Sequence, residues 1–157
     1  MAANALRREA LLDAAIAVLA ERGTRGLTFR AVDANAGTPV GTASNYFANR
    51  DELIAQVFEQ IGVRLAPDPD EVDRLSQRPP SKELFADYVR YIVTRLSAER
   101  AVTIALFELR LEASRNPRIA DLVQNWVSTG FAADVAFNEQ ADLPGGRSQL
   151  ALFHYAL

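Results

Sequence analysis

The chain of 157 residues contains no cysteine and only one histidine, His154. Without cysteine it forms no disulfide bond and no thiolate metal site, and we expect it to reside in the reducing cytoplasm. A single imidazole leaves little for histidine-based catalysis or metal binding. We therefore expect neither a metal site nor a cofactor.

Long hydrophobic runs and catalytic sequence patterns are also missing. The apolar stretch LLDAAIAVLAERG is interrupted by Asp13 and Glu21, so it is neither a signal-peptide core nor a membrane span. There is no glycine-rich phosphate loop and no HExxH motif. A carboxylate-only enzyme using Glu108 and Glu112 is an open alternative, although nothing in the sequence requires it. The sequence favours a protein that is not an enzyme and has no membrane partner.

The chain has no excess of positive charge, and its formal net charge is −3. Up to residue 64, seven basic residues balance seven acidic ones, and beyond it thirteen acidic residues face ten basic ones. Any surface that binds nucleic acid must therefore be local.

Apolar residues recur at three- and four-residue spacing, which predicts an all-α protein without strands. The expected helices cover 4–22, 28–37, 39–47, a segment beginning at Asn49-Arg50, 81–98, 100–115 and 118–138, followed by a last apolar run after Pro144-Gly145-Gly146. Residues 65–80 hold four prolines and are interpreted as a linker with at most one helical turn. Because LALFHYAL stops in mid-pattern, we expect the natural protein to continue beyond it.

Residues 28–47 carry the pattern of a helix-turn-helix. Thr28 is a predicted N-cap, Gly37 is expected to be left-handed, and Val32, Ala36 and Ala43 should pack between the two helices. The second helix is slim and then ends in Tyr46-Phe47, of which Phe47 is assigned to the core. A slim, polar helix of this kind suits the major groove of DNA.

The segment TFRAVDANAGTPVGTASNYFANRDELIAQVF, with the helix before it, resembles the N-terminal part of the tetracycline-repressor (TetR) family of bacterial regulators. The matching features are Ala36-Gly37 before the turn, the small Thr42, the aromatic pair and the Arg50-Asp51 pair that opens the next helix. The resemblance covers about residues 5–60. The rest of the chain resembles the family's variable ligand-binding half only in layout.

This resemblance implies a three-helix DNA-binding domain over residues 1–48 and a helical effector-binding and dimerisation domain over 49–157, incomplete at its C-terminus. Residues 39–47 would be the recognition helix. Contacts with the double-stranded DNA operator would come from Thr28, Arg30, Val40, Thr42, Ser44, Asn45, Tyr46 and Arg50. Thr28, Tyr46 and Arg50 would bind phosphate, and the others would read sequence or groove shape.

Two positions depart from the family pattern. Ser44 stands where a tyrosine is usual, and Asp33 stands where a small alanine is usual. Either Asp33 points at the third helix and forms hydrogen bonds there, or the expected helix phase is shifted by one residue. Four further arginines are expected on ordinary wet faces: Arg7, Arg8, Arg22 and Arg25.

The second half would hold a small, largely apolar effector between its helices. The candidate pocket residues are Tyr88, Tyr91, Phe107, Glu108, Arg110 and Trp126. Glu108 and Arg110 interrupt an apolar helix, where a buried polar group needs a partner or a ligand. The alternative is that Glu108, Glu112 and Arg115 form an exposed, ion-paired face.

The sequence thus predicts a ligand-responsive transcriptional repressor, bound as a homodimer to a near-palindromic operator and released by a small molecule. The alternative is a helical adaptor that docks on another protein without binding DNA. The salt dependence of binding distinguishes the two, because DNA binding weakens steeply with salt and apolar helix docking does not.

Overall fold

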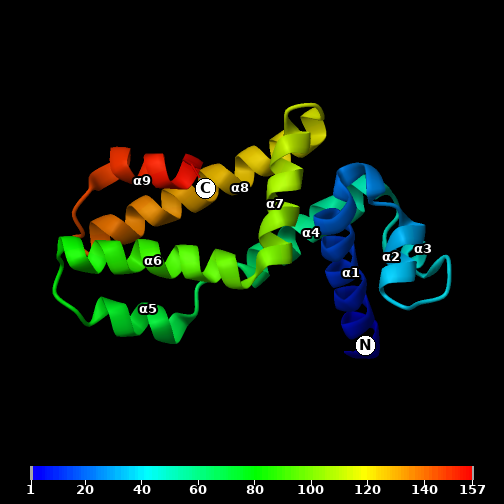
Figure 1. The fold of residues 1–157 in the computed structure, drawn as a ribbon, viewed down its shortest axis with the longest axis horizontal. Helices are drawn as coiled ribbons and strands as arrows, with labels where there is room; N and C mark the ends of the chain where they lie inside the picture. Colours follow the sequence, from blue (N-terminus) through cyan, green and yellow to red (C-terminus); the bar gives the residue numbers. More distant parts are fainter. Residues whose placement is uncertain (1, 157) are drawn as a thin grey trace. The chain divides into compact units, whose positions relative to one another are not determined.

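The computed structural model describes residues 2–156, which form nine helices and no β-strand (Figure 1). The helices are α1 Ala2–Gly26, α2 Phe29–Asn35, α3 Thr42–Tyr46, α4 Arg50–Arg64, α5 Pro69–Ser76, α6 Lys82–Ala98, α7 Arg100–Ala113, α8 Pro117–Gln140 and α9 Gly146–Ala156. The predicted all-α fold is confirmed. None of the helices within 2–156 is both long and apolar enough to span a bilayer.

The helices belong to two compact units. Unit 1 runs to Ala66 and resumes over Glu99–Leu122, so it contains α1 to α4, α7 and the beginning of α8. Unit 2 contains α5, α6, the rest of α8 and α9. The functional division predicted after residue 48 stays a prediction.

Helix α1 is the centre of unit 1, where it packs most extensively against α7 and also contacts α2 and α4. Its inward face carries fully buried Leu11, Ala15 and Leu19, at the spacing of an amphipathic helix. At Gly23 the backbone turns left-handed, with φ of 64°, before a last turn ends at Gly26. The helix expected over 4–22 therefore breaks one residue beyond its predicted end.

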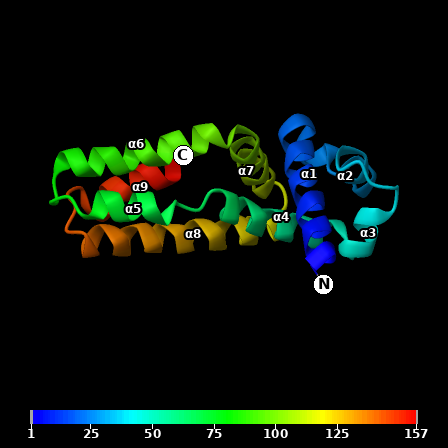
Figure 2. The ribbon, with the colours of Figure 1, turned by 90° about the horizontal axis from the view of Figure 1, so that it is seen from below.

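The core of unit 2 joins α5, α6 and the segments around α9. Its buried residues are Leu75, Leu84, Phe85, Tyr88 and Leu143. Tyr88 of α6 meets Phe137 of α8 edge-on at 5.1 Å between ring centroids, and Phe85 lies 6.0 Å from Phe153 of α9. Through these ring contacts α6 packs against both α8 and α9. Figure 2 shows α5, α6, α8 and α9 running alongside one another.

Residues 65–80 are more regular than the predicted linker with one turn, because residues 69–76 form helix α5. The Asp68 side chain caps it by accepting the N–H of Asp70 at 3.0 Å. Pro69 occupies the first turn, where a backbone N–H has no helical partner to lose. The same proline that suggested a linker therefore starts a helix.

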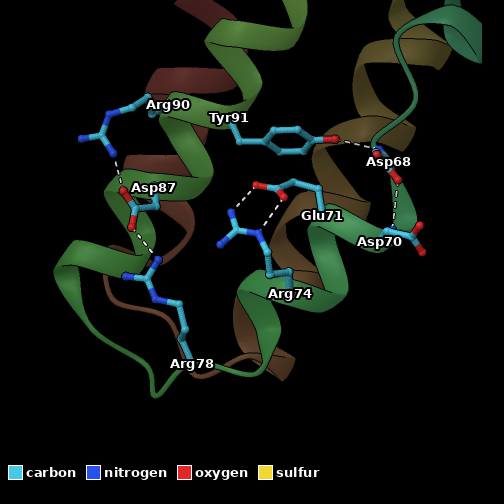
Figure 3. A network of polar contacts seen from close by, with 8 residues as sticks. All are labelled: Asp68, Asp70, Glu71, Arg74, Arg78, Asp87, Arg90 and Tyr91. Atoms are coloured by element: carbon cyan, nitrogen blue, oxygen red, sulfur yellow. Dashed lines mark hydrogen bonds and ion pairs between the residues drawn. The ribbon is translucent and has the colours of Figure 1, made fainter.

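An exposed polar network covers α5, α6 and the connection between them (Figure 3). Arg74 donates to Glu71 at 2.8 Å within α5, and this hydrogen bond lowers the pKa of the Glu71 carboxyl. Asp87 of α6 accepts from Arg78 at 2.6 Å and also from Arg90. These hydrogen bonds, chiefly that from Arg78, lower the pKa of Asp87.

Candidate nucleic-acid interface

Helix α2 and the turn after it have the predicted form. The Thr28 hydroxyl oxygen caps α2 by accepting the Ala31 N–H at 3.1 Å. Gly37 is left-handed, with φ of 64°, and Thr38 N–H donates to the carbonyl of Asp33 at 2.9 Å. Val32 of α2 and Ala43 of α3 are fully buried, so the two helices pack through small aliphatic groups as expected.

The third helix is shorter than predicted. Instead of residues 39–47 it covers only Thr42–Tyr46, because Gly41 is left-handed, with φ of 94°, and serves as its N-cap. Residues 39–41 form a turn, closed by the Thr42 N–H donating to the Pro39 carbonyl at 3.1 Å. Val40 is therefore a turn residue, and 79% of its surface is exposed.

The side chain of Asp33 fixes the N-terminus of α3. This side chain is buried, with 1% exposure, although it is a carboxylate. One oxygen accepts the Gly41 N–H at 2.7 Å, and the other accepts the Ala43 N–H at 2.7 Å. The first alternative drawn from the sequence, in which Asp33 points at the third helix, is confirmed.

Arg8 of α1 holds the other end of α3. Its Nη2 donates to the Tyr46 carbonyl at 3.1 Å, and its Nη1 donates to the Gln56 side chain of α4. The guanidinium also lies 5.5 Å from the centroid of the Phe47 ring, which is buried as predicted. The expectation that Arg8 lies on an ordinary wet face is wrong, because the side chain is half-buried in these contacts.

The surface around α3 contains the predicted DNA-contacting residues in accessible positions. Thr28, Arg30, Val40, Ser44, Asn45 and Arg50 are exposed, and Thr42 and Tyr46 are half-buried. The Thr42 hydroxyl donates to Pro39 O at 2.6 Å, and the Ser44 hydroxyl donates to Gly41 O at 2.8 Å. Both hydroxyl protons are thus used locally, which leaves acceptor lone pairs for a partner.

Arg50 begins α4 and is partly engaged within unit 1. Its Nη2 donates to the Thr24 carbonyl at 2.6 Å, and its Nε donates to the Leu27 carbonyl at 3.3 Å. Asn49 caps the same helix by accepting the Glu52 N–H at 2.9 Å. Arg50 therefore ties the start of α4 to the turn between α1 and α2, a role that the sequence pattern did not indicate.

The six predicted pocket residues are divided between the units. Phe107, Glu108 and Arg110 are in α7 of unit 1, and Tyr88, Tyr91 and Trp126 are in unit 2. The carboxylates of Glu108 and Glu112 in α7 lie beside the end of α1. The Glu112 carboxylate accepts the Thr24 hydroxyl at 3.0 Å, and a Cβ placed on Gly23 would lie 2.9 Å from the Glu108 carboxylate.

The two tyrosines of unit 2 differ in their hydrogen bonding. The hydroxyl of Tyr88 is buried and has no partner among residues 2–156, and burial raises its pKa. The hydroxyl of Tyr91 accepts the backbone N–H of Asp68 at 2.7 Å (Figure 3). Of the two, Tyr88 therefore has an unmet hydrogen-bonding capacity.

Comparison with protein families gives two matches along the chain. Residues 11–57 match the model described as "Bacterial regulatory proteins, tetR family", and residues 80–157 match "Tetracyclin repressor-like, C-terminal domain". The first match contains α2, α3 and the hydrogen bonds that the Asp33 carboxylate accepts from Gly41 and Ala43. No curated protein matches the sequence.

Several solved structures are similar. The multidrug binding protein EbrR complexed with imidazole is 27% identical, with a TM-score of 0.67 over 96% of this chain and 79% of that one. EbrR complexed with proflavin is 25% identical, with a TM-score of 0.55 over 95% and 81%. A TetR-family member from Streptomyces coelicolor A3 is 23% identical, with a TM-score of 0.61 over 96% of both chains, and supports the fold alone.

Proposed function

We propose that this chain, which belongs to the tetracycline-repressor (TetR) family of DNA-binding transcriptional regulators, represses transcription by placing α3 in the major groove of an operator. The observation that carries the proposal is the construction of α3. A helix of five residues presents exposed Ser44 and Asn45 while buried Asp33 and half-buried Arg8 hold its ends. A helix that contacts base edges needs such support, because hydrogen bonds to bases tolerate little displacement of the helix.

The residues around α3 divide into two chemical groups. Thr28, Tyr46 and Arg50 would bind phosphate and set the register on the duplex. Asn45 offers an amide suited to adenine, and exposed Val40 offers an apolar contact for a thymine methyl group. Thr42 and Ser44 would accept hydrogen bonds from base amino groups, and Arg30 would reach a guanine or a phosphate.

Homodimerisation would place two copies of α3 in major grooves about one helical turn apart and make the operator near-palindromic. Exposed apolar residues on α9, Leu152 and Tyr155, support a self-associating surface in unit 2. We further propose a cytoplasmic location and no enzymatic activity, in keeping with a family of regulators.

A small-molecule effector would release the repressor by binding better to the state that misfits DNA. Similarity to EbrR supports this, because that protein was seen with imidazole and with proflavin. The unpartnered hydroxyl of Tyr88 supports a polar contact within a largely apolar site. Within unit 2, the other proposed pocket residues are Tyr91 and Trp126. Phe107, Glu108 and Arg110 lie in unit 1, and their role stays a prediction from the sequence.

The proposal is tested by selecting binders of the protein from a pool of random duplex DNA at two salt concentrations. Recovery of a near-palindromic sequence, bound much less tightly at the higher salt concentration, would support it. If no sequence is enriched at either concentration, α3 does not read DNA, and the adaptor function becomes the better account. A duplex bound without salt dependence would also contradict the phosphate contacts.

A further inference from the structure

Helix α3 is too short to hold its own conformation. It has five residues, whereas isolated helices in water need roughly 12 to 15 residues even with favourable sequences. A single turn also leaves most of its N–H and C=O groups without helical partners. The orientation of α3 must therefore be fixed by groups outside it.

At the N-terminal end this group is the carboxylate of Asp33. Its two oxygens accept from two different donors, Gly41 N–H and Ala43 N–H, both at 2.7 Å. A negative charge at this end also matches the positive end of the helix dipole. An asparagine could satisfy only one of these donors, because its second polar atom is an NH₂ group that would face an N–H.

At the C-terminal end the group is the guanidinium of Arg8. It donates to Tyr46 O, a carbonyl in the last turn of α3, and to Gln56 of α4. Gln56 in turn donates to Glu52 at 2.9 Å, and the Glu52 carboxylate accepts the Ala48 N–H at 2.7 Å. The segment that leaves α3 is thus fixed to both α1 and α4.

We propose that Asp33 and Arg8 are positioning residues for operator recognition, which hold α3 at the angle needed to read bases without contacting DNA themselves. The inference rests on the proposed function. Phosphate attraction is long-ranged and tolerates a displaced helix, whereas hydrogen bonds to base edges do not. Loosening α3 should therefore reduce the preference for the operator more than the affinity for DNA in general.

The test compares binding of the full chain to the selected operator duplex with binding to a scrambled duplex of equal length. Asp33→Asn should weaken operator binding by about tenfold to a hundredfold, the range expected for losing a hydrogen bond to a charged group. Affinity for the scrambled duplex should not fall, because the substitution removes a negative charge and no phosphate contact. Arg8→Gln should act in the same direction. Arg8→Lys, which keeps the charge and an N–H donor group but loses the fork that reaches two acceptors, should restore part of the preference.

The matched control is Asp68→Ala, which removes an aspartate N-cap from α5 in unit 2. It should lower the melting temperature without changing the ratio of the two affinities. If Asp33→Asn weakens both duplexes equally, or neither, the positioning role is wrong. If the parent protein binds the selected and the scrambled duplex equally well, the proposed function itself is wrong. That result differs from a failure of the positioning role, in which the parent prefers the selected duplex.

Amide hydrogen exchange keeps the test decisive if Asp33→Asn is poorly stable. In the parent protein, the N–H groups of Gly41 and Ala43 should exchange slowly, since both donate to Asp33. In Asp33→Asn, at a temperature where α4 stays protected, exchange of at least one of these two should accelerate. Unchanged exchange at both would show that the carboxylate does not hold α3.

Discussion

Among single residues, Arg50 has two roles that one substitution can separate. It donates to the carbonyls of Thr24 and Leu27 through part of its guanidinium, and its remaining N–H groups are proposed to bind phosphate. Lysine keeps the charge but not the fork that reaches two carbonyls. Arg50→Lys should therefore lower the melting temperature and keep the salt slope of DNA binding.

Arg50→Ala should lower the melting temperature and also reduce the salt slope of DNA binding by about one unit. Thermal melting and binding titrations over a range of salt concentrations measure the two effects separately. A slope that is the same in Arg50→Ala as in the parent would limit Arg50 to its role within unit 1.

Tyr88 and Tyr91 form a matched pair in α6. Removing the unpartnered hydroxyl of Tyr88 should leave the free energy of unfolding unchanged or raise it, because no hydrogen bond is lost. Removing the hydroxyl of Tyr91 leaves the Asp68 N–H without its acceptor and should cost about 1 kcal/mol. Denaturant titrations of Tyr88→Phe and Tyr91→Phe test this, and a larger loss for Tyr88→Phe would contradict it.

Sequence reasoning identified Asp33 as an unusual residue but missed Arg8. Asp33 was noticeable because an acid occupied a position expected to be small, and its possible partners were only eight to ten residues away. The acceptor of Arg8 is a backbone carbonyl 38 residues further along the chain. A backbone acceptor leaves no trace in the pattern of side chains, so only the fold could reveal it.

At the scale of elements, the helix-turn-helix depends on two left-handed glycines, Gly37 and Gly41. Apart from the chain neighbours of each glycine, no atom of residues 2–156 lies within 4 Å of a Cβ placed on Gly37 or Gly41, so substitution is costly only through the backbone. Gly37→Ala should destabilise the protein by about 1–2 kcal/mol, and Gly37→Asn should cost less, because asparagine tolerates the left-handed region. Equal stability of the parent and Gly37→Ala, measured by denaturant titration, would contradict the assigned turn.

The α5–α6 network should contribute stability that is sensitive to acid. The pKa of Asp87 is lowered in the folded state, so the unfolded chain binds more protons at acidic pH. This contribution is complete above the unfolded pKa of about 4 and is lost as the pH falls through the lower folded value.

Asp87→Asn should therefore destabilise the protein near neutral pH and matter progressively less below about pH 4. The effect should be small, because the ion pairs are exposed to solvent. Asp73→Asn is the control, since Asp73 lies on α5 and makes no ion pair among residues 2–156. Equal effects of both substitutions at every pH would contradict the role of the network.

Element boundaries were predicted well where periodic apolar faces are long, and poorly around glycine and proline. Helix α3 was expected to start at Pro39, but the left-handed Gly41 and the Asp33 carboxylate start it at Thr42. Helix α5 was expected as a single turn within a linker, because prolines that can begin a helix resemble those of a linker. In both places a tertiary or capping contact decided the boundary.

At the scale of the whole molecule, the compact unit that carries α3 also includes α7 and the start of α8. Thr24 of α1 donates to Glu112 of α7, and Arg118 of α8 pairs with Asp51 of α4. Elements expected in the effector-binding half are thus bonded to the helices that support α3. The family and its helical fold could be predicted from sequence, but these contacts depend on residues distant along the chain.

We propose that α3 and the residues beside it form the DNA-binding surface. Amide hydrogen exchange of the full chain, measured with and without its selected duplex, locates that surface. Added protection should centre on residues 28–50, and a scrambled duplex should give little protection at α3. Protection confined to unit 2, or none at all under conditions where the duplex is bound, would contradict it.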